Sequence, residues 1–298
     1  MKHAFLIIAH DNYEQLNFLI SLLDNQLNDI YIHIDKKSPP PPCFKVNKSK
    51  LFIIDAEESI DVRWGDVSQI QCEMLLYEKA FSSNSVYSYY HLLSGYCLPI
   101  KSMKYIHSFF DLNKGFNFIG FGQYQEERFL DRIEKRHYLT KMYRETCYFK
   151  RIFVKIIRVI IEMFVNAILI SKRDKSLTYK KGANWCSLTE DFVEYLVANK
   201  SRILKHYNRS YCADEVYKQT LMWNSRFKNT IYDCSDEFNG CMRLIDWDRG
   251  RPYVWGNEIK DYSIIRNSKC LFARKFHIQK YPQMISFIKE LVYNDIEV

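Results

Sequence analysis

Two short apolar runs close to the N-terminus indicate how this chain begins to fold. The first spans Ala4–Ala9, and the second lies within D-I-Y-I-H-I-D-K-K, where it stops at Asp35 and two lysines. Both runs are rich in β-forming residues and predict buried strands. Between them, Glu14–Asn25 places its apolar residues on one helical face, so the sequence predicts a β-α-β unit with a parallel sheet.

Asp35 is the first candidate for a ligand contact. In open α/β sheets, ligands bind in the crevice beyond the carboxyl ends of the strands, and Asp35 directly follows such a strand. The alternative is that its carboxylate only opens the proline-rich loop Ser38–Pro42, because aspartate is common in turns.

The same alternation of strands and helices continues up to residue 122. Short apolar segments predict strands over Leu51–Ile54, Tyr87–Leu93 and Phe116–Phe121, and amphipathic segments predict helices over Trp64–Ala80 and Ser102–Leu112. This pattern is typical of a doubly wound α/β domain. Because the sequence contains neither G-x-G-x-x-G after the first strand nor G-x-x-x-x-G-K-[ST] anywhere, a dinucleotide oxidoreductase and a P-loop enzyme are disfavoured.

Residues 123–180 are basic and helical in pattern. Within them, the apolar run Ile152–Ile170 is interrupted by two cationic residues and a glutamate, which disfavours a transmembrane helix. An amphipathic helix with a basic flank can lie on an anionic membrane, and it can equally pack on the core or on a partner. Peripheral membrane contact through residues 152–173 is therefore one of two alternatives.

Residues 181–298 return to a mixed α/β pattern, and no linker or low-complexity tract precedes them. The expected strands are Ala183–Leu188, Arg243–Trp247 and Cys270–Lys275, and the expected helices are Glu190–Asn199, Glu215–Asn224 and Tyr281–Tyr293. We therefore expect a single domain over residues 1–298. It would comprise a nucleotide-binding half (1–122), a helical insertion (123–180) and a half for catalysis and acceptor binding (181–298).

The composition narrows the range of partners. With 47% hydrophobic residues and a net charge of +8, the chain is a globular protein for which an anionic partner is expected. The basic residues are scattered and form no nucleic-acid-binding signature, so a nucleic acid partner is not expected.

Nine cysteines without a C-x-x-C pair predict reduced thiols. The apolar run at the N-terminus is too short to span a membrane and lacks a cleavage site. We expect a cytoplasmic protein, with peripheral contact at the inner membrane face as the open alternative.

Three local patterns contain residues that could bind a ligand or take part in catalysis. They are W-G-D-V-S-Q at 64–69, Y-C-A-D-E-V-Y-K-Q-T-L at 211–221 and L-F-A-R-K-F at 271–276. The second places Asp214 and Glu215 where a helix is expected to begin. Carboxylates there complement the helix dipole, which is a sufficient structural reason for them. The same position also allows a carboxylate to face a crevice from a rigid backbone.

Cations occur at the ends of two predicted strands. Arg274 and Lys275 end one strand, and Arg243 begins another. Adjacent residues of a strand point to opposite faces, so one of the first two is expected to face a given site. A pair of such cations can neutralise a leaving diphosphate without a metal ion.

Six motifs occur in a recognisable order: H-A-F-L-I-I-A-H, I-Y-I-H-I-D-K-K, V-R-W-G-D-V-S-Q-I, Y-H-L-L-S-G-Y-C-L-P-I-K-S, A-D-E-V-Y-K-Q-T-L and L-F-A-R-K-F. Together they resemble the core-2/I-branching β-1,6-N-acetylglucosaminyltransferases, a family that also holds the peptide O-xylosyltransferases. The resemblance runs from about residue 3 to 280, and 125–180 lacks a clear counterpart. It implies a GT-A-like, Rossmann-type α/β fold, in which helices flank a mixed, mostly parallel sheet. It also implies a UDP-sugar donor, inversion at the anomeric carbon and no metal or other cofactor.

The resemblance also implies roles for individual residues. Glu215 matches the catalytic base, Asp35 the acidic contact to the nucleoside, Lys275 the lysine on the diphosphate and Arg243 its arginine partner. The candidate contacts to the nucleotide-sugar are His10, Asp35, Trp64, Gly65, Arg243, Arg274 and Lys275.

Two further residues are candidate contacts to the acceptor. Trp185 lies in G-A-N-W-C-S-L, which resembles the stretch of the family near the acceptor, and Arg136 lies in the basic insertion. For Trp185 the alternative is a core position, and for Arg136 it is a solvated helix face.

Three features leave the donor sugar and the metal open. Cys97 stands where family members usually carry Asp, and the R-K of A-R-K-F is closer to the xylosyltransferase form. In addition, Asp246–Asp248 is a literal D-x-D after an apolar strand, the arrangement that holds Mn²⁺ in many GT-A enzymes. The expected activity is metal-independent, inverting transfer of a sugar from UDP to a hydroxyl of a glycan acceptor, and a lipid-linked acceptor is expected. The first choice of sugar is N-acetylglucosamine in β-linkage. The alternatives are a xylosyltransferase, a non-catalytic carbohydrate- or nucleotide-binding protein and a peripheral membrane structural protein.

Overall fold

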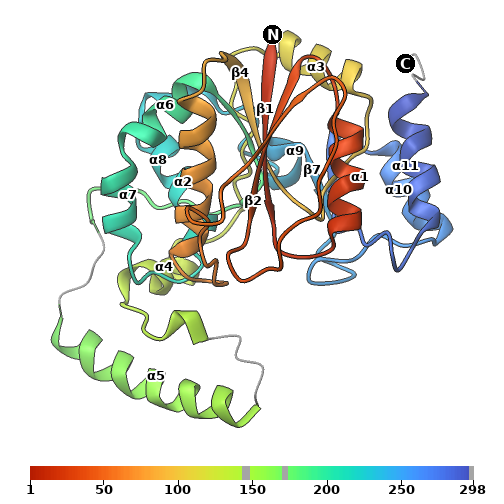
Figure 1. Ribbon diagram of the computed structural model, residues 1–298. Coiled ribbons are helices and arrows are strands. Elements are labelled where there is room, and N and C mark those ends of the chain that lie inside the picture. Colours follow the sequence, from red (N-terminus) through yellow and green to blue (C-terminus); the bar gives the residue numbers. More distant parts are fainter. Residues whose placement is uncertain (143–147, 170–173, 295–298) are drawn as a thin grey trace.

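A five-stranded sheet runs through the centre of the computed structural model, which describes residues 1–142, 148–169 and 174–294 (Figure 1). Its strands are, in spatial order, β3 (Lys50–Ile53), β2 (Asn28–Ile34), β1 (Lys2–Ala9), β4 (Tyr87–Ser94) and β6 (Ser187–Thr189). Neighbouring strands are parallel except for the antiparallel pair β4 and β6. The predicted α/β class with a mostly parallel sheet is therefore confirmed.

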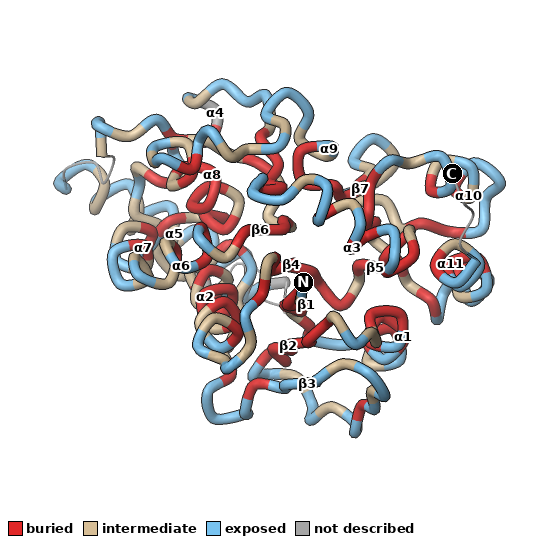
Figure 2. Tube along the Cα trace, turned by 90° about the horizontal axis from the view of Figure 1, so that it is seen from above, coloured by how far each residue is buried: buried red, intermediate tan, exposed pale blue. Residues whose placement is uncertain are grey.

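Helices cover both faces of this sheet, and Figure 2 shows the buried strands enclosed between them. One face carries α1 (Tyr13–Leu23), α3 (Met103–Leu112), α10 (Ile259–Asn267) and α11 (Gln283–Tyr293), and the other carries α2 (Ser68–Phe81), α6 (Glu190–Ala198), α7 (Lys200–Tyr207) and α8 (Tyr217–Trp223). Side chains alternate along β1, so that Phe5 and Ile7 enter the first core while Ala4 and Leu6 enter the second.

A second, smaller sheet was not expected from the sequence. It contains β5 (Leu98–Pro99), β8 (Phe272–Arg274) and β7 (Arg243–Ile245) in that order, with α9 (Glu237–Cys241) immediately before β7. The predicted strands near residues 243 and 270 therefore exist, but they pair with each other in this separate sheet.

The predicted strand Phe116–Phe121 is wrong. Asn117 and Phe118 form only isolated bridges. The backbone at Gly120 instead packs against α9, where a Cβ atom would lie 2.4 Å from the carbonyl oxygen of Glu237. This close approach leaves no room for a side chain at residue 120.

Two helices begin later than the sequence predicts. Residues 64–67 form a turn in which Gly65 adopts a φ of 77°, a left-handed conformation that is incompatible with a right-handed helix. The segment after Tyr211 forms the short 3₁₀ helix η2 (Ala213–Glu215), and α8 starts only at Tyr217. Both corrections concern turns that belong to the candidate site.

The insertion is helical, as predicted. It consists of α4 (Glu127–Glu134), the short 3₁₀ helix η1 (Thr140–Met142) and α5 (Tyr148–Ile168), which lies apart from the sheet in Figure 1. A further 3₁₀ helix, η3 (Arg226–Thr230), follows α8. Among the described residues, no helix combines the length and the apolar character needed to cross a membrane. Residues 170–173 of the predicted membrane-contact segment lie outside the described residues.

The eight described cysteines are free thiols, and six of them are buried. Cys97 is among the buried ones, and its Sγ lies 3.4 Å from the backbone nitrogen of Ser94. The Cys97 thiol thus accepts a hydrogen bond within the turn that follows β4.

Three buried histidines form a cluster between β1, β4 and α3. His91 Nε2 lies 3.0 Å from His3 Nδ1, and His91 Nδ1 lies 2.8 Å from Ser187 Oγ. His107 Nε2 lies 2.7 Å from Asn28 Oδ1. Burial lowers the pKa of His3 to about 3 and that of His107 to about 4. The neutral rings are therefore part of the folded structure.

We expect the His107→Gln variant to lose less stability on acidification than the wild type. His107 binds a proton below about pH 6.5 when unfolded and only below about pH 4 when folded. The contribution of the neutral His107 ring to the free energy of unfolding is therefore complete above about pH 6.5. It is lost progressively as the pH falls toward about 4. The loss is about 1.4 kcal/mol per pH unit over this interval. Urea unfolding at a series of pH values measures the difference in free energy of unfolding between the two proteins. His10→Gln is the control, since that side chain is 60% exposed. Equal pH slopes in the wild type and His107→Gln would contradict the prediction.

Candidate functional site

The carboxyl ends of β1, β2 and β4 bring several of the predicted contacts together. The backbone nitrogen of Asp35 is hydrogen-bonded to the last residue of β1 at 2.9 Å. Tyr96, which follows β4, donates a hydrogen bond to Asp11 at 2.8 Å, and its ring centre lies 6.0 Å from that of His10. The ammonium group of Lys275 lies 4.4 Å from the centre of the same tyrosine ring. His10, Asp35 and Lys275 therefore surround one edge of the sheet.

Asp35 is held by a neighbouring cation. Its carboxylate is almost buried and accepts hydrogen bonds from Lys37 Nζ at 2.7 Å to each oxygen. The same ammonium group lies 2.7 Å from Asp61. These contacts fix the Asp35 carboxylate where β2 ends, in the position expected of a ligand contact in an open sheet.

The W-G-D and Y-C-A-D-E motifs form one structural unit. Their first residues, Trp64 and Tyr211, are in contact although they lie 147 positions apart in the sequence. Their rings meet edge to face at 5.5 Å, and the backbone nitrogen of Cys212 donates to the carbonyl oxygen of Gly65 at 3.0 Å. A Cβ atom on Gly65 would lie 2.6 Å from the ring of Tyr211. Glycine is therefore required here both for its positive φ and for this close approach.

Glu215 ends η2 with one carboxylate oxygen anchored and the other available. Its Oε2 lies 3.2 Å from Arg132 Nη1 and 3.2 Å from Lys181 Nζ. Its side chain is 34% exposed, and within the described part of the chain Oε1 has no hydrogen-bond partner. A ligand hydroxyl that approaches Oε1 would meet an oriented carboxylate.

The segment Lys181–Trp185 connects Glu215 with Arg274. Lys181 at one end pairs with Glu215, and at the other end the guanidinium carbon of Arg274 lies 4.6 Å from the ring centre of Trp185. Four residues of chain span at most about 14 Å. The carboxylate and the cation therefore belong to the same side of the molecule, as a site for group transfer requires.

A buried ion pair lies beneath this segment. Lys218 Nζ in α8 is 2.5 Å from Glu73 Oε2 in α2, and both side chains are fully buried. Tyr217 donates to the same oxygen at 2.6 Å, and Asn184 donates to the other oxygen at 2.7 Å. These four residues join α2, α8 and the Lys181–Trp185 segment, so they fix the backbone on which Glu215 is carried.

Asp214 differs from its neighbour Glu215 in exposure. Burial, with smaller contributions from the Glu215 and Glu73 charges, raises the pKa of Asp214 to about 8. Gln69 donates a hydrogen bond to its Oδ2 at 2.9 Å. Asp214 is therefore a protonated, buried acid near neutral pH, and Glu215 is the accessible carboxylate of the pair.

Sequence reasoning missed the Glu73–Lys218 pair, although a signal existed. Helical spacing places Glu73 three residues after Ile70 and four before Tyr77, both of which are buried. A carboxylate on an apolar helix face is expected to have a buried partner.

Tyr124 and Glu237 were also missed. The Tyr124 ring centre lies 4.2 Å from Lys181 Nζ, and its hydroxyl lies 3.5 Å from Glu237 Oε2. Burial raises the pKa of Glu237. Polar groups thus border Glu215 on the side of α9.

Arg243 lies in the interior between the two sheets, and this corrects its predicted place on the diphosphate. It is 1% exposed, and its guanidinium donates to the carbonyl oxygens of Cys241 and Cys186 at 2.8 Å each and to Ser187 Oγ at 3.0 Å. Burial lowers the pKa of Arg243. Because these contacts hold the guanidinium inside the protein, we assign it a structural role and exclude it from the cations that meet a ligand.

The backbone of Arg136, the predicted acceptor contact in the insertion, is bonded to α5. Its backbone nitrogen and carbonyl oxygen bond to the side chain of Asn166 in α5, at 2.8 and 3.1 Å. It is Arg132, four residues earlier, that reaches Glu215. The insertion therefore contributes to the site through α4.

The family model described as Core-2/I-Branching enzyme matches residues 3–267 of the chain. The protein belongs to the core-2/I-branching enzyme family. It is therefore a glycosyltransferase, for which a nucleotide-sugar donor and a glycan acceptor are implied.

Other comparisons add little to this assignment. The crystal structure of mouse xyloside xylosyltransferase 1 in its apo form is similar at 11% sequence identity, with coverage of 91% of this chain and 96% of that chain and a TM-score of 0.38. Because this TM-score is below 0.5, the similarity establishes no shared function. No curated protein sequence matches the chain.

In this core-2/I-branching enzyme, the D-x-D at Asp246–Asp248 is not a pair of free carboxylates. Asp246 Oδ2 accepts a hydrogen bond from Arg249 Nε at 2.6 Å, and its Oδ1 accepts two backbone hydrogen bonds at 3.0 Å each. Arg249 also bonds to Asp261 at 2.8 Å. In residues 1–142, 148–169 and 174–294, no group of three or more metal-ligating side chains is gathered. The contacts favour a structural role for Asp246.

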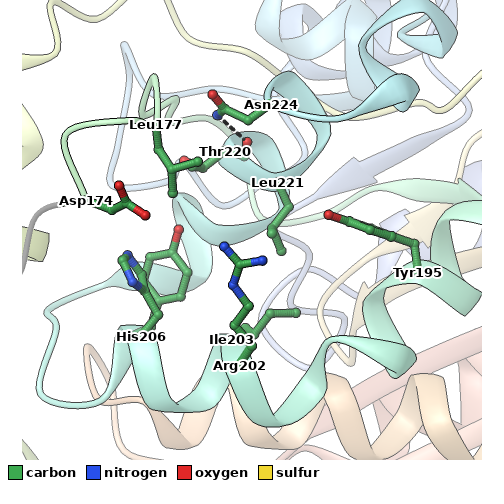
Figure 3. Close-up of a pocket in the computed structure, with 10 residues that line it drawn as sticks. Asp174, Leu177, Tyr195, Arg202, Ile203, His206, Thr220, Leu221 and Asn224 are labelled. Atoms are coloured by element: carbon green, nitrogen blue, oxygen red, sulfur yellow. Dashed lines mark hydrogen bonds between the residues drawn. The ribbon is translucent and has the colours of Figure 1, made fainter.

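A cavity of about 170 Å³ in the core-2/I-branching enzyme lies away from this set of residues (Figure 3). It is enclosed by α6, α7, α8 and the segment Asp174–Leu177, and Asn224 at its edge donates to the carbonyl oxygen of Thr220 at 2.7 Å. None of the predicted site residues lines it. We therefore place the candidate active site at the strand ends and not in this cavity.

Proposed function

We propose that the protein transfers N-acetylglucosamine from UDP-N-acetylglucosamine to a hydroxyl of a glycan acceptor, with inversion at the anomeric carbon and Glu215 as the base. The observation that carries the proposal is the state of the Glu215 carboxylate. Arg132 and Lys181 hold Oε2, while Oε1 is left without a partner among the described residues. A positioned carboxylate of this kind can accept the proton of an attacking hydroxyl.

The transfer is a single displacement. As the acceptor oxygen forms a bond to the anomeric carbon, its proton moves to Glu215 Oε1. The bond between the anomeric carbon and the β-phosphate oxygen breaks on the opposite face, and its electron pair leaves with UDP. Asp214 is a poor second nucleophile, because it is buried and its pKa is raised to about 8. This difference between the two carboxyl groups favours one displacement over two.

Arg274 and Lys275 would stabilise the negative charge that grows on the departing diphosphate. Arg274 lies against Trp185 near Glu215, and Lys275 lies at the Tyr96 edge of the sheet near Asp35. In this arrangement Asp35 binds the nucleoside, and His10, Trp64 and Gly65 contribute to the donor pocket. We propose that these two cations act in place of a metal ion, a proposal supported by the engagement of Asp246 with Arg249.

The acceptor that we propose is a lipid-linked glycan at the inner face of the cell membrane. Trp185, beside Arg274, is the candidate acceptor contact, with Tyr124 and Glu237 next to it in the ring of polar groups around Lys181. UDP-xylose is the alternative donor, because the A-R-K-F motif is similar to the xylosyltransferase form.

A screen of UDP-sugars by thermal unfolding tests the donor proposal. A ligand that binds only the native protein at 100 times its Kd stabilises it by about 2.7 kcal/mol, so UDP-N-acetylglucosamine is expected to raise the melting temperature by several degrees. Product formation with that donor is expected to persist in excess EDTA. A larger rise with UDP-xylose would transfer the proposal to the xylosyl donor, and loss of activity in EDTA would overturn its metal-free form. If no UDP-sugar raises the melting temperature, the proposed nucleotide-sugar pocket is overturned.

A further inference from the structure

Helix α5 turns Glu162 and Asn166 toward the rest of the protein, together with the buried Val154, and exposes most of its large apolar residues. Glu162 Oε1 accepts a hydrogen bond from the backbone nitrogen of Tyr138 at 3.1 Å, and Asn166 bonds to both backbone groups of Arg136. A helix on the surface of a globular protein normally packs its apolar face on the core. In α5, Val154 is the one buried residue among the described side chains, and the wider apolar face is exposed.

The outward face forms a continuous apolar stripe. Phe153, Ile156, Ile160, Met163 and Phe164 recur at helical spacing, and their side chains are between 47% and 64% exposed. Figure 1 shows this helix standing apart from the sheet and its covering helices. A contiguous exposed patch of large apolar residues marks a surface that another molecule covers.

The charges on α5 indicate what that molecule is. Lys150 and Lys155 are both exposed. Helical spacing places Lys150 at one border of the stripe, about 90° from its centre, and Lys155 about 130° from the centre, on the side of Glu162 and Asn166. Glu162 is the one acidic residue of the helix, and it points inward, 3.5 Å from His137 and within 4.0 Å of Arg158. An apolar stripe on a helix with exposed lysines complements an anionic lipid surface, whose acyl chains accept the stripe and whose headgroups attract the long lysine side chains.

We propose that α5 is an interfacial helix that docks the protein on an anionic lipid surface. Its 21 residues would lie in the plane of the membrane over a length of about 31 Å, with the stripe in the acyl boundary and the lysines at the headgroups. Docking would also bring the site close to the membrane. Arg136, bonded to α5, is four residues from Arg132, which holds Glu215, and four residues span at most about 14 Å. The lipid-linked acceptor rests on the proposed function, whereas docking itself does not.

Vesicle binding by the full chain tests this proposal. We expect the wild type to cosediment with phosphatidylcholine vesicles that contain phosphatidylglycerol at least tenfold more strongly than with pure phosphatidylcholine vesicles. Phe153→Glu/Ile160→Glu is expected to lower this binding at least tenfold. The control Leu112→Glu/Ile259→Glu makes the same charge change at side chains that are 86% and 88% exposed elsewhere, and it should bind like the wild type.

Two further measurements make each outcome decisive. Transfer to a water-soluble acceptor should be unchanged in Phe153→Glu/Ile160→Glu, so that a loss of docking is distinguishable from a failure of the proposed function. Light scattering gives the mass in solution. A wild-type dimer that Phe153→Glu/Ile160→Glu converts to a monomer would identify the stripe as an interface between copies and overturn lipid docking. Equal vesicle binding by the stripe variant and the control would overturn it as well.

Discussion

Glu215→Gln is expected to lower kcat by at least about 10²-fold while the affinity for UDP persists, because removal of a general base typically costs 10² to 10⁴ in rate. Glutamine can keep the contacts to one side of the carboxylate position but cannot accept the proton of the acceptor hydroxyl. Steady-state transfer to a glycan acceptor measures kcat, and calorimetric titration with UDP measures the affinity.

The adjacent residue provides a matched control for this experiment. Asp214 is buried and protonated near neutral pH, and its Oδ2 accepts a hydrogen bond from Gln69. Asp214→Asn keeps the shape and the acceptor oxygen, so we expect kcat within a few-fold of the wild type. A similar loss of kcat in both variants would mean that the conformation of the turn at residues 213–215, and not the Glu215 carboxylate alone, determines the rate. A wild type that binds UDP but transfers no sugar would favour the non-catalytic alternative.

Lys218→Met is expected to lower the free energy of unfolding by about 3–5 kcal/mol, because it leaves the buried Glu73 charge without its cation. The pair is 2.5 Å apart and both side chains are fully buried. Removing both charges in Glu73→Gln/Lys218→Met should restore much of the loss, since replacing a buried pair is far less costly than breaking one. Urea unfolding measures all three proteins.

A second ion pair on α2 serves as the comparison. Lys200 lies 2.5 Å from Glu78, but these side chains are 32% and 39% exposed. Lys200→Met is therefore expected to cost no more than about 1 kcal/mol. If Lys218→Met were as mild as Lys200→Met, the Glu73–Lys218 pair would not stabilise the fold as we infer.

The first strands and the candidate position of Asp35 could be predicted because the local pattern decides them. Every residue of β2 is buried, so the strand appears in the sequence as an apolar run with an abrupt charged end. The family motifs likewise locate Glu215, Arg274 and Lys275. What brings them together is tertiary: the contacts of Lys181 with Glu215 and of Trp185 with Arg274 join segments that lie far apart in the chain.

The errors have a common physical cause. Arg243 begins an apolar strand in the same way as a ligand-binding cation would, and the sequence contains no signal that its side chain is buried between two sheets. Phe116–Phe121 has the composition of a strand, but the approach of α9 to Gly120 prevents regular pairing there. Glu73 lies on an apolar helix face, and its partner Lys218 is 145 positions away. In each case a distant segment determines the role of the residue.

Arg243 has a consequence for how the enzyme admits its donor. It begins β7 in the small sheet and donates hydrogen bonds to Cys186 and Ser187 at the edge of the large one. Shearing of one sheet past the other would strip a buried guanidinium of these partners, at a cost of several kcal/mol. Opening and closing by relative movement of the two sheets is thereby disfavoured, and entry of the nucleotide-sugar is left to rearrangements of surface loops around a stationary frame.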